Sequence, residues 1–142
     1  MEEALKKYKV ITKYKVQWGQ MDAARHVNNT VYLRWAESAR IAYFEAMGMD
    51  TSFQGGGVGP ILGWQDCKYI FPLTFPDTAI VGARTIEKKE DRFIMECAIY
   101  SASHQRISAI SKQSIIPYNY GEFKKVGLPH EWVETIDKLD SI

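Results

Sequence analysis

The chain has 142 residues, 46% of them hydrophobic, and its 18 Lys and Arg residues nearly balance its 17 Asp and Glu residues. This balance excludes the strongly basic surface that is typical of a nucleic-acid-binding protein. The acidic N-terminus is unlike a signal peptide, and no run approaches the roughly 18 apolar residues of a membrane span. We therefore expect a single domain over residues 1–142, in the cytoplasm, with no nucleic-acid partner and no membrane span.

The first regular pattern runs from Tyr8 to Trp18, where apolar and polar residues alternate as in a strand with one solvated face. Apolar and aromatic members of this pattern are predicted to share one face: Tyr8, Val10, Tyr14, Val16 and Trp18. Residues 19–29 have no period and are predicted to form a loop. A helix is expected from Thr30 to Met47, ending at Gly48, because glycine best tolerates the left-handed backbone that follows a helix.

One broad face of this helix is predicted to be buried. A step of roughly 100° per residue places eight side chains in one sector: Tyr32, Trp35, Ala36, Ala39, Ala42, Tyr43, Ala46 and Met47. The alanines in its middle would let another surface approach closely, and the aromatic residues at its margins suit a curved partner. A sheet wrapped around the helix fits this pattern.

Residues 51–60 are rich in glycine and are predicted to be a flexible connection. Four strand-like segments follow, over residues 61–71, 78–89, 92–102 and 105–116, and a short helix is expected over residues 129–139. The short links between the strands predict an antiparallel meander. The fold class is therefore α+β, a five-stranded antiparallel sheet against a long helix. Because one helix cannot cover such a sheet fully, association of two copies is the natural hypothesis.

Chemistry-bearing side chains cluster in the loop just before the long helix. Asp22, His26, Asn28 and Asn29 supply a carboxylate, an imidazole and two amides, and no Ser or Cys nucleophile lies beside the histidine. Asn and Thr at residues 28–30 are typical of a helix N-cap. A helix N-terminus has unpaired N–H groups, so a carboxylate beside it could act on a carbonyl whose oxygen is bound there.

These residues carry a family likeness. The pattern Trp18-Gly19-x-x-Asp22-Ala23-x-x-His26-Val27-Asn28-Asn29-x-x-Tyr32-Leu33-x-x-x-Glu37-x-x-Arg40 resembles the signature of hotdog-fold acyl-CoA thioesterases of the 4-hydroxybenzoyl-CoA thioesterase type. The segment Tyr69-x-x-Pro72-Leu73-x-Phe75-Pro76-Asp77-Thr78 resembles the link between the family's second and third strands. Relatives commonly have an acidic residue at the position of Gln20 and glycine at that of Arg25.

The resemblance implies a long helix wrapped by a five-stranded sheet, in a homodimer or homotetramer with active sites between subunits. It implies that Asp22 attacks an acyl-CoA thioester or activates water, and that the backbone amide near Asn29 polarises the thioester oxygen. His26 is a further catalytic candidate. Substrate-binding candidates are Trp18, Tyr32, Glu37 and Trp64. No cofactor is implied, since coenzyme A is part of the substrate.

A purely structural role is the alternative for each of these residues. Asp22 could simply order the loop, and His26 could only form hydrogen bonds across it. Glu37 has Arg40 as a possible ion-pair partner three residues along the helix. The aromatic candidates Trp18, Tyr32 and Trp64 could be ordinary core residues. A non-catalytic hotdog module that binds an acyl thioester or acyl carrier protein is the alternative function.

Metal and disulfide chemistry are not predicted. Cys67 and Cys97 both fall in strand-like patterns, and neither has Cys or His at metal-ligand spacing. We expect both to be free thiols in a reducing compartment.

Overall fold

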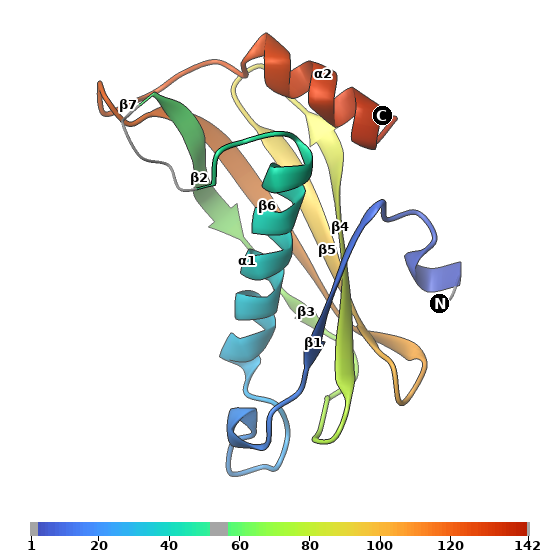
Figure 1. Ribbon diagram of the computed structural model, residues 1–142. Coiled ribbons are helices and arrows are strands. Elements are labelled where there is room, and N and C mark those ends of the chain that lie inside the picture. The colour runs from blue at the N-terminus through green and yellow to red at the C-terminus, as the bar shows by residue number, and fades with distance from the viewer. Residues whose placement is uncertain (1–2, 52–56, 142) are drawn as a thin grey trace.

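One antiparallel sheet curves around the helix α1 (Asn29–Ala46) in the computed structural model of the chain, which describes residues 3–51 and 57–141 (Figure 1). The remaining elements are β1 (Val10–Lys15), β2 (Val58–Gln65), β3 (Lys68–Tyr69), β4 (Thr78–Lys88), β5 (Phe93–Ser101), β6 (Arg106–Asn119), β7 (Lys124–Lys125) and α2 (His130–Leu139). Two short 3-10 helices occupy Glu3–Leu5 and Trp18–Gln20. The predicted α+β architecture is confirmed.

The strands follow the order β1-β4-β5-β6-β2, and the short strands β3 and β7 also pair with β6. The predicted meander of β4, β5 and β6 is confirmed, but the segment 61–71 is two strands instead of one. The regular ladder with β6 is interrupted at Asp66, whose N–H donates to the Lys112 carbonyl at 3.0 Å. The Asp66 carboxylate accepts a hydrogen bond from the Lys112 N–H, and its carbonyl accepts one from the Ser111 hydroxyl. These bonds fix the break between β2 and β3. The main path thus has the five strands predicted, with two short additions.

The connection predicted over residues 51–60 is also corrected at its end. β2 begins at Val58, and its residues Gly59 and Pro60 are buried. Residues 52–56 lie outside the described residues. The helix α1 ends as predicted, with Gly48 in the left-handed region at a φ of 90°.

The buried face of α1 agrees with the prediction at its centre and differs at its margins. Tyr32, Trp35, Ala36, Ala39, Tyr43 and Met47 are buried as predicted. Ala46 is exposed and Ala42 half-buried, whereas Arg40 and Phe44 are buried. The sheet reaches further around the helix on the β2 side than the sequence pattern implied, so it covers these two residues.

The N-terminal segment packs on the outer face of the sheet, opposite α1. Tyr8 was expected on the same face as Val10, but it joins an outer cluster of buried residues with Leu5, Ile80, Ala98 and Tyr100. The backbone at Gly82 makes this possible, because a Cβ there would lie 2.5 Å from the Tyr8 ring. The Tyr8 hydroxyl donates to Glu96 at 2.7 Å, which anchors the segment to β5.

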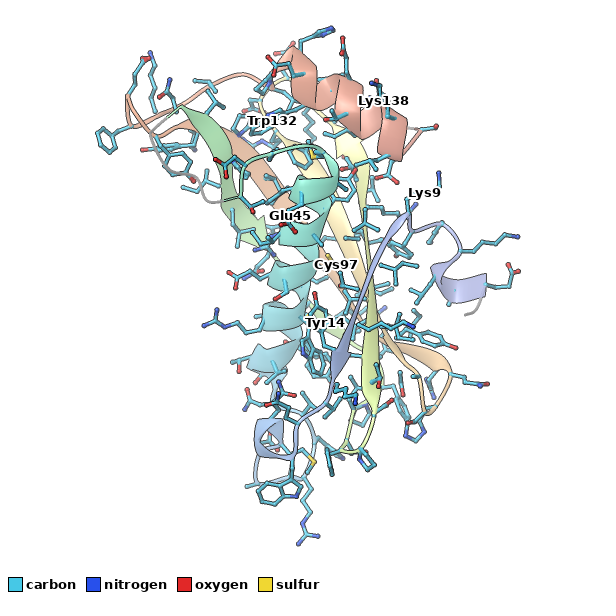
Figure 2. The ribbon with its side chains drawn as sticks, viewed as in Figure 1. Lys9, Tyr14, Glu45, Cys97, Trp132 and Lys138 are labelled. Carbon is cyan, nitrogen blue, oxygen red and sulfur yellow. The ribbon has the colours of Figure 1, made fainter. Side chains whose placement is uncertain are left out.

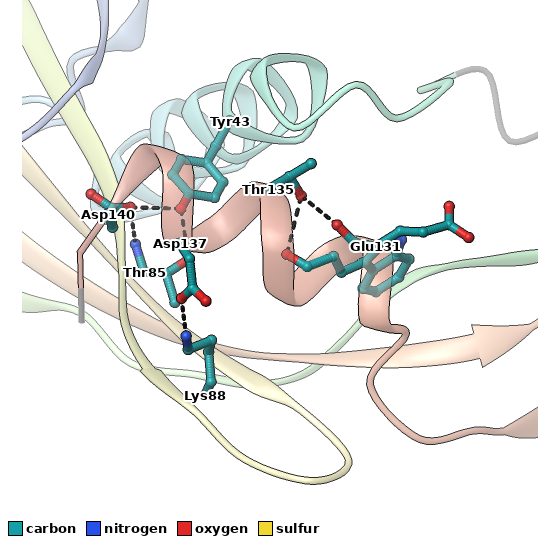
Figure 3. A network of polar contacts seen from close by, with 8 residues as sticks. Tyr43, Thr85, Lys88, Glu131, Thr135, Asp137 and Asp140 are labelled. Atoms are coloured by element: carbon teal, nitrogen blue, oxygen red, sulfur yellow. Dashed lines mark hydrogen bonds and ion pairs between the residues drawn. The ribbon is translucent and has the colours of Figure 1, made fainter.

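The C-terminal helix α2 is tied to both α1 and the sheet through Asp140 (Figure 3). The buried Asp140 carboxylate accepts hydrogen bonds from the Tyr43 hydroxyl (2.6 Å) and the Thr85 N–H (2.9 Å). Burial and the hydrogen bond to Asp140 raise the pKa of Tyr43 well above its ordinary value. An ion pair between Lys88 and Asp137 adds a contact at the surface. Neither helix, nor any other in the described ranges, is both long and apolar enough to cross a bilayer.

Candidate active site

Asp22 lies at the tip of a small backbone hairpin that precedes α1. Met21 and Val27 form an antiparallel bridge below the tip. Above it, the Asp22 N–H donates to the His26 carbonyl and the Arg25 N–H donates to the Asp22 carbonyl, both at 2.9 Å. The Asp22 side chain is exposed, and its Oδ1 accepts a hydrogen bond of 2.9 Å from the Ala24 N–H. Its Oδ2 has no hydrogen-bond partner within residues 3–51 and 57–141. One carboxylate oxygen is thus held in place while the other is available.

Arg25 closes this turn in a left-handed conformation, with a φ of 64°. Few residues other than glycine adopt this conformation readily. The turn therefore explains the glycine that relatives commonly have at this position, and the backbone shape is retained here with a long basic side chain.

The N-terminus of α1 presents a backbone amide, that of Asn29, which is unused within the described part of the chain. The Asn28 side chain caps the helix and accepts from the Thr30 N–H at 2.9 Å, and the Val31 N–H donates to the Asn28 carbonyl at 3.0 Å. The Asn29 N–H has no acceptor in the described part of the chain. A free N–H at this end also carries the positive end of the helix dipole, so it can donate to a negatively charged oxygen.

Backbone hydrogen bonds within the loop bring the segment that contains Asp22 beside the N-terminus of α1. The Asn28 N–H donates to the Gln20 carbonyl at 2.9 Å, so residues 20–22 run antiparallel to residues 26–28. The Gln20 side chain accepts from the Gln17 N–H at 2.8 Å and closes the 3-10 helix Trp18–Gln20. Gln20, which stands where relatives commonly have an acidic residue, therefore stabilises the loop through a hydrogen bond to the backbone.

The segment 69–75 supports the loop and the helix start from the other side. The buried Leu73 is bonded through both backbone groups, its carbonyl accepting from the Val27 N–H (2.8 Å) and its N–H donating to the Tyr32 hydroxyl (2.9 Å). The Tyr69 hydroxyl donates to the Asn29 carbonyl at 2.9 Å. The two family-like segments of the sequence are therefore in direct contact.

A cleft of about 640 Å³ opens at the hairpin tip. It is lined by Trp18, Met21, Asp22, Arg25, Thr74 and Phe75. The exposed fractions of Trp18 and Phe75 are 72% and 46%, which is unusual for large apolar side chains. The cleft thus combines two open aromatic surfaces, a carboxylate and a basic side chain, a set that suits a long amphipathic ligand.

The structure brings together some of the residues predicted for the site. Trp18 and Asp22 line the cleft, and the Asn29 amide lies at the helix end next to the loop. His26 is exposed beside Asp22, with its backbone carbonyl bonded to Asp22.

Three other predicted residues lie elsewhere. Tyr32 is only 3% exposed and takes a supporting position under the Leu73 amide, so it does not form an open pocket wall. Trp64 is exposed on β2 at the sheet edge. Glu37 faces a separate groove between α1 and β2, and its ion-pair partner is Arg34 (3.1 Å) instead of Arg40. On the helix, Arg34 precedes Glu37 by one turn and is exposed, whereas Arg40 is buried.

Four cleft residues were not predicted as site residues: Met21, Arg25, Thr74 and Phe75. Phe75 belongs to the second family-like segment, which was the one sequence signal for it. No group of three or more His, Cys, Asp or Glu side chains that could hold a metal is found among the residues described. The absence of a metal or cofactor stays a prediction.

Comparison with known proteins places the chain in a family. A sequence model described as the Thioesterase-like superfamily matches residues 16–136. A search of curated proteins finds no match to the sequence.

Solved structures resemble the chain along nearly all its length. A putative thioesterase from Pseudomonas aeruginosa has 25% sequence identity and a TM-score of 0.80, with 91% of this chain and 98% of that one covered. A thioesterase from Thermus thermophilus, in complex with coenzyme A and Zn, has 24% identity and a TM-score of 0.85, with 96% and 98% covered. A 1,4-dihydroxy-2-naphthoyl-CoA thioesterase from Synechocystis has 18% identity and a TM-score of 0.80, with 92% and 96% covered. The predicted hotdog fold is confirmed.

Proposed function

This chain belongs to the thioesterase-like superfamily, and we propose that it is an acyl-CoA thioesterase that hydrolyses the thioester to a free acid and coenzyme A. The family assignment confirms the prediction of a thioester hydrolase. The observation that carries the proposed site is the placement of the Asp22 carboxylate at a cleft beside the start of α1. Among the residues that the structure describes, neither Asp22 Oδ2 nor the Asn29 N–H has a hydrogen-bond partner.

Two routes are available to Asp22. As a general base, the carboxylate takes a proton from water while the water oxygen attacks the thioester carbon. As a nucleophile, it attacks that carbon itself, and the mixed anhydride that forms is hydrolysed by water. In both routes the carbon–sulfur bond breaks and the coenzyme A thiolate leaves and takes up a proton. The Asn29 N–H would donate to the carbonyl oxygen as negative charge develops on it.

The cleft residues would hold the coenzyme A arm. Trp18 and Phe75 offer open apolar surface to the pantetheine portion, and Arg25 offers a charge-assisted donor to phosphate. The Thermus thermophilus structure, which contains coenzyme A, supports this class of ligand for the fold. The name of the Synechocystis protein likewise supports a coenzyme A thioester as substrate.

We propose that two copies associate through β2, with Trp64 and Glu37 placed at or near the contact. β2 is an end strand of the sheet, and four of its apolar side chains are exposed: Val58, Ile61, Leu62 and Trp64. An apolar edge strand of this length is normally paired or covered. The opposite edge strand, β1, exposes Lys13 and Lys15 instead, as edges that avoid pairing do.

A cytoplasmic location is proposed from the cysteines and from the substrate class. Cys67 and Cys97 are both free, as predicted, and free thiols are usual in reducing compartments.

A panel of short, long and aromatic acyl-CoA thioesters, with detection of the released thiol, tests the proposed activity. Thiol release above the uncatalysed rate supports the hydrolase. Tight binding of acyl-CoA with no thiol release from any panel member would favour the non-catalytic binding module and overturn the proposal.

A further inference from the structure

A guanidinium and an imidazole surround one aromatic ring where β6 begins, in what we call the Phe71 cluster: Phe71, His104 and Arg106. The guanidinium carbon of Arg106 lies 4.4 Å from the centre of the Phe71 ring, and the ring centres of His104 and Phe71 are 4.8 Å apart. Phe71 is half-buried, whereas His104 and Arg106 are exposed. No acidic side chain pairs with either of them in the part of the chain that the structure describes. The aromatic ring therefore supports a cation whose N–H groups can still bind an anion.

Hydrogen bonds fix the turn between β5 and β6 from which this cluster extends. The Asp77 Oδ1 atom accepts from the Ser103 N–H (2.9 Å) and the Thr78 N–H (2.7 Å), and Oδ2 accepts from the Ser101 hydroxyl. The Ser101 hydroxyl oxygen in turn accepts from the His104 N–H at 3.1 Å. Both oxygens of the Asp77 carboxylate thus have donors within the protein, and the position of the turn is set by them.

The segments that form the cluster are nearly free of negative charge. Residues 97–121 contain no Asp or Glu, and Asp77 is the one acidic residue of the segment 67–86. Lys15 of β1 is exposed opposite Thr78 and adds a second positive charge to that of Arg106 at this end of the sheet. Because the Asp77 carboxylate is already bonded by three donors, the cations favour an anionic ligand here.

A second cleft connects the cluster with the candidate active site. The turn between β5 and β6 and the link between β3 and β4 lie at the end of the molecule where α1 begins (Figure 2). Phe75 lines the cleft at Asp22 and also a neighbouring cleft of about 490 Å³, which extends to Ser103. Phe71 and Phe75 are four residues apart, so at most roughly 14 Å of chain separates them. One extended ligand can therefore reach from Asp22 past Phe75 to the Phe71 cluster.

We propose that the Phe71 cluster binds the 3′-phosphate at the nucleotide end of coenzyme A, with Arg106 and His104 as donors. The pantetheine arm separates the thioester from the nucleotide, so a thioester at Asp22 and a 3′-phosphate at Arg106 can belong to one molecule. This phosphate is a second anion, separate from the diphosphate that Arg25 can meet in the cleft. Contact with the Phe71 ring restricts the Arg106 side chain before binding and so lowers the entropic cost of the contact.

This inference rests on the proposed thioesterase function and specifies the carrier of the acyl group. The phosphopantetheine arm of an acyl carrier protein lacks the adenosine 3′-phosphate. A site that binds this group therefore selects thioesters of free coenzyme A.

Matched substrates that differ only in the 3′-phosphate test the inference. We expect wild-type kcat/KM to be at least about fivefold higher for an acyl-CoA than for the corresponding 3′-dephospho-acyl-CoA, because a charge-assisted contact is gained at an exposed site. In Arg106→Gln this ratio should fall to near one. The control is Arg92→Gln, which removes a guanidinium bonded to Asp91 at the other end of β5 and should keep the ratio. An unchanged ratio in Arg106→Gln would contradict the role of Arg106.

A binding measurement on the wild-type protein separates this inference from the proposed activity. Calorimetry should show tighter binding of adenosine 3′,5′-bisphosphate than of adenosine 5′-monophosphate. Equal binding of the two nucleotides, or equal kcat/KM for the two thioesters, would overturn the 3′-phosphate site and leave the thioesterase standing. Selective binding of the bisphosphate without hydrolysis of any thioester would support the site and overturn the proposed activity.

Discussion

Thr30 makes two hydrogen bonds to the side-chain oxygen of Asn28, one from its backbone N–H at 2.9 Å and one from its hydroxyl at 2.6 Å. Asn28 is thereby fixed as the cap of α1 and the start of the helix is defined. Because the cap accepts from Thr30, the amide of Asn29 is left without an acceptor among the described residues. The cap is thus what presents the proposed oxyanion donor.

Replacement of the cap should affect both stability and turnover. We expect Asn28→Ala to lower the free energy of unfolding by about 1 kcal/mol, which is typical of losing an N-cap. It should also lower kcat, because the first turn of the helix is no longer held. Urea denaturation and steady-state kinetics measure the two effects. Asn28→Asp, which keeps an acceptor, is the control, and an alanine variant with unchanged stability would contradict the capping role.

Tyr32 is expected to matter through its hydroxyl. In Tyr32→Phe the buried Leu73 N–H loses its acceptor, which should cost about 1–3 kcal/mol of stability. The matched control is Tyr14→Phe, since no hydrogen bond of the Tyr14 hydroxyl is found in the described part of the chain. Equal stability of the two variants in chemical denaturation would show that the Tyr32 contact contributes little.

The contribution of Asp77 to the stability of the folded protein should be lost at low pH. Burial raises the pKa of Asp77, but hydrogen bonds from Ser101, Ser103 and Thr78 outweigh this effect and hold it below its ordinary value. The unfolded chain therefore takes up a proton near pH 4 before the folded chain does. The stabilisation is complete above that pH and is lost as the pH falls through the folded-state pKa.

The free energy of unfolding, measured from pH 7 down to pH 3, tests the predicted direction of this pH dependence. The difference in stability between wild type and Asp77→Asn should be largest near neutral pH and should shrink below about pH 4. A difference that stays constant or grows as the pH falls would contradict the assignment.

The apolar edge of β2 should control association. Leu62→Lys places a charge on the exposed face of this strand and is expected to convert the proposed dimer to a monomer. Turnover should fall with it if active sites form between subunits. Lys13→Glu, on the opposite edge strand, is the control and should change neither property. Sedimentation velocity decides the oligomeric state, and a monomeric wild-type protein would contradict the proposed contact.

The sequence predicted the scaffold well where one local pattern determined the structure. The helix that ends before Gly48, the three strands β4, β5 and β6 and the C-terminal helix follow from periodicity and turn residues. The position of Tyr8 could not be predicted in this way. It depends on the space above Gly82, some seventy residues later in the chain, which no local pattern records.

Only part of the candidate site was predicted, because only part of it depends on local sequence patterns. Asp22 and the helix start were found because loop residues and caps are local signals. Phe75 and Thr74 enter the cleft only because the Leu73 backbone bonds to Val27 and Tyr32. Helical spacing made Arg40 a possible ion-pair partner of Glu37, yet Arg40 is buried and Glu37 pairs with Arg34.

The turnover of Asp22→Asn tests the central claim most directly. The amide keeps the acceptor for the Ala24 N–H, so the loop should fold normally, but it can act neither as base nor as nucleophile. With an acyl-CoA that the wild type hydrolyses, we predict a loss of at least roughly a hundredfold in kcat. Asp91→Asn, an exposed carboxylate in another turn, should retain full activity. Near wild-type turnover in Asp22→Asn would contradict the assignment of Asp22 as the catalytic carboxylate.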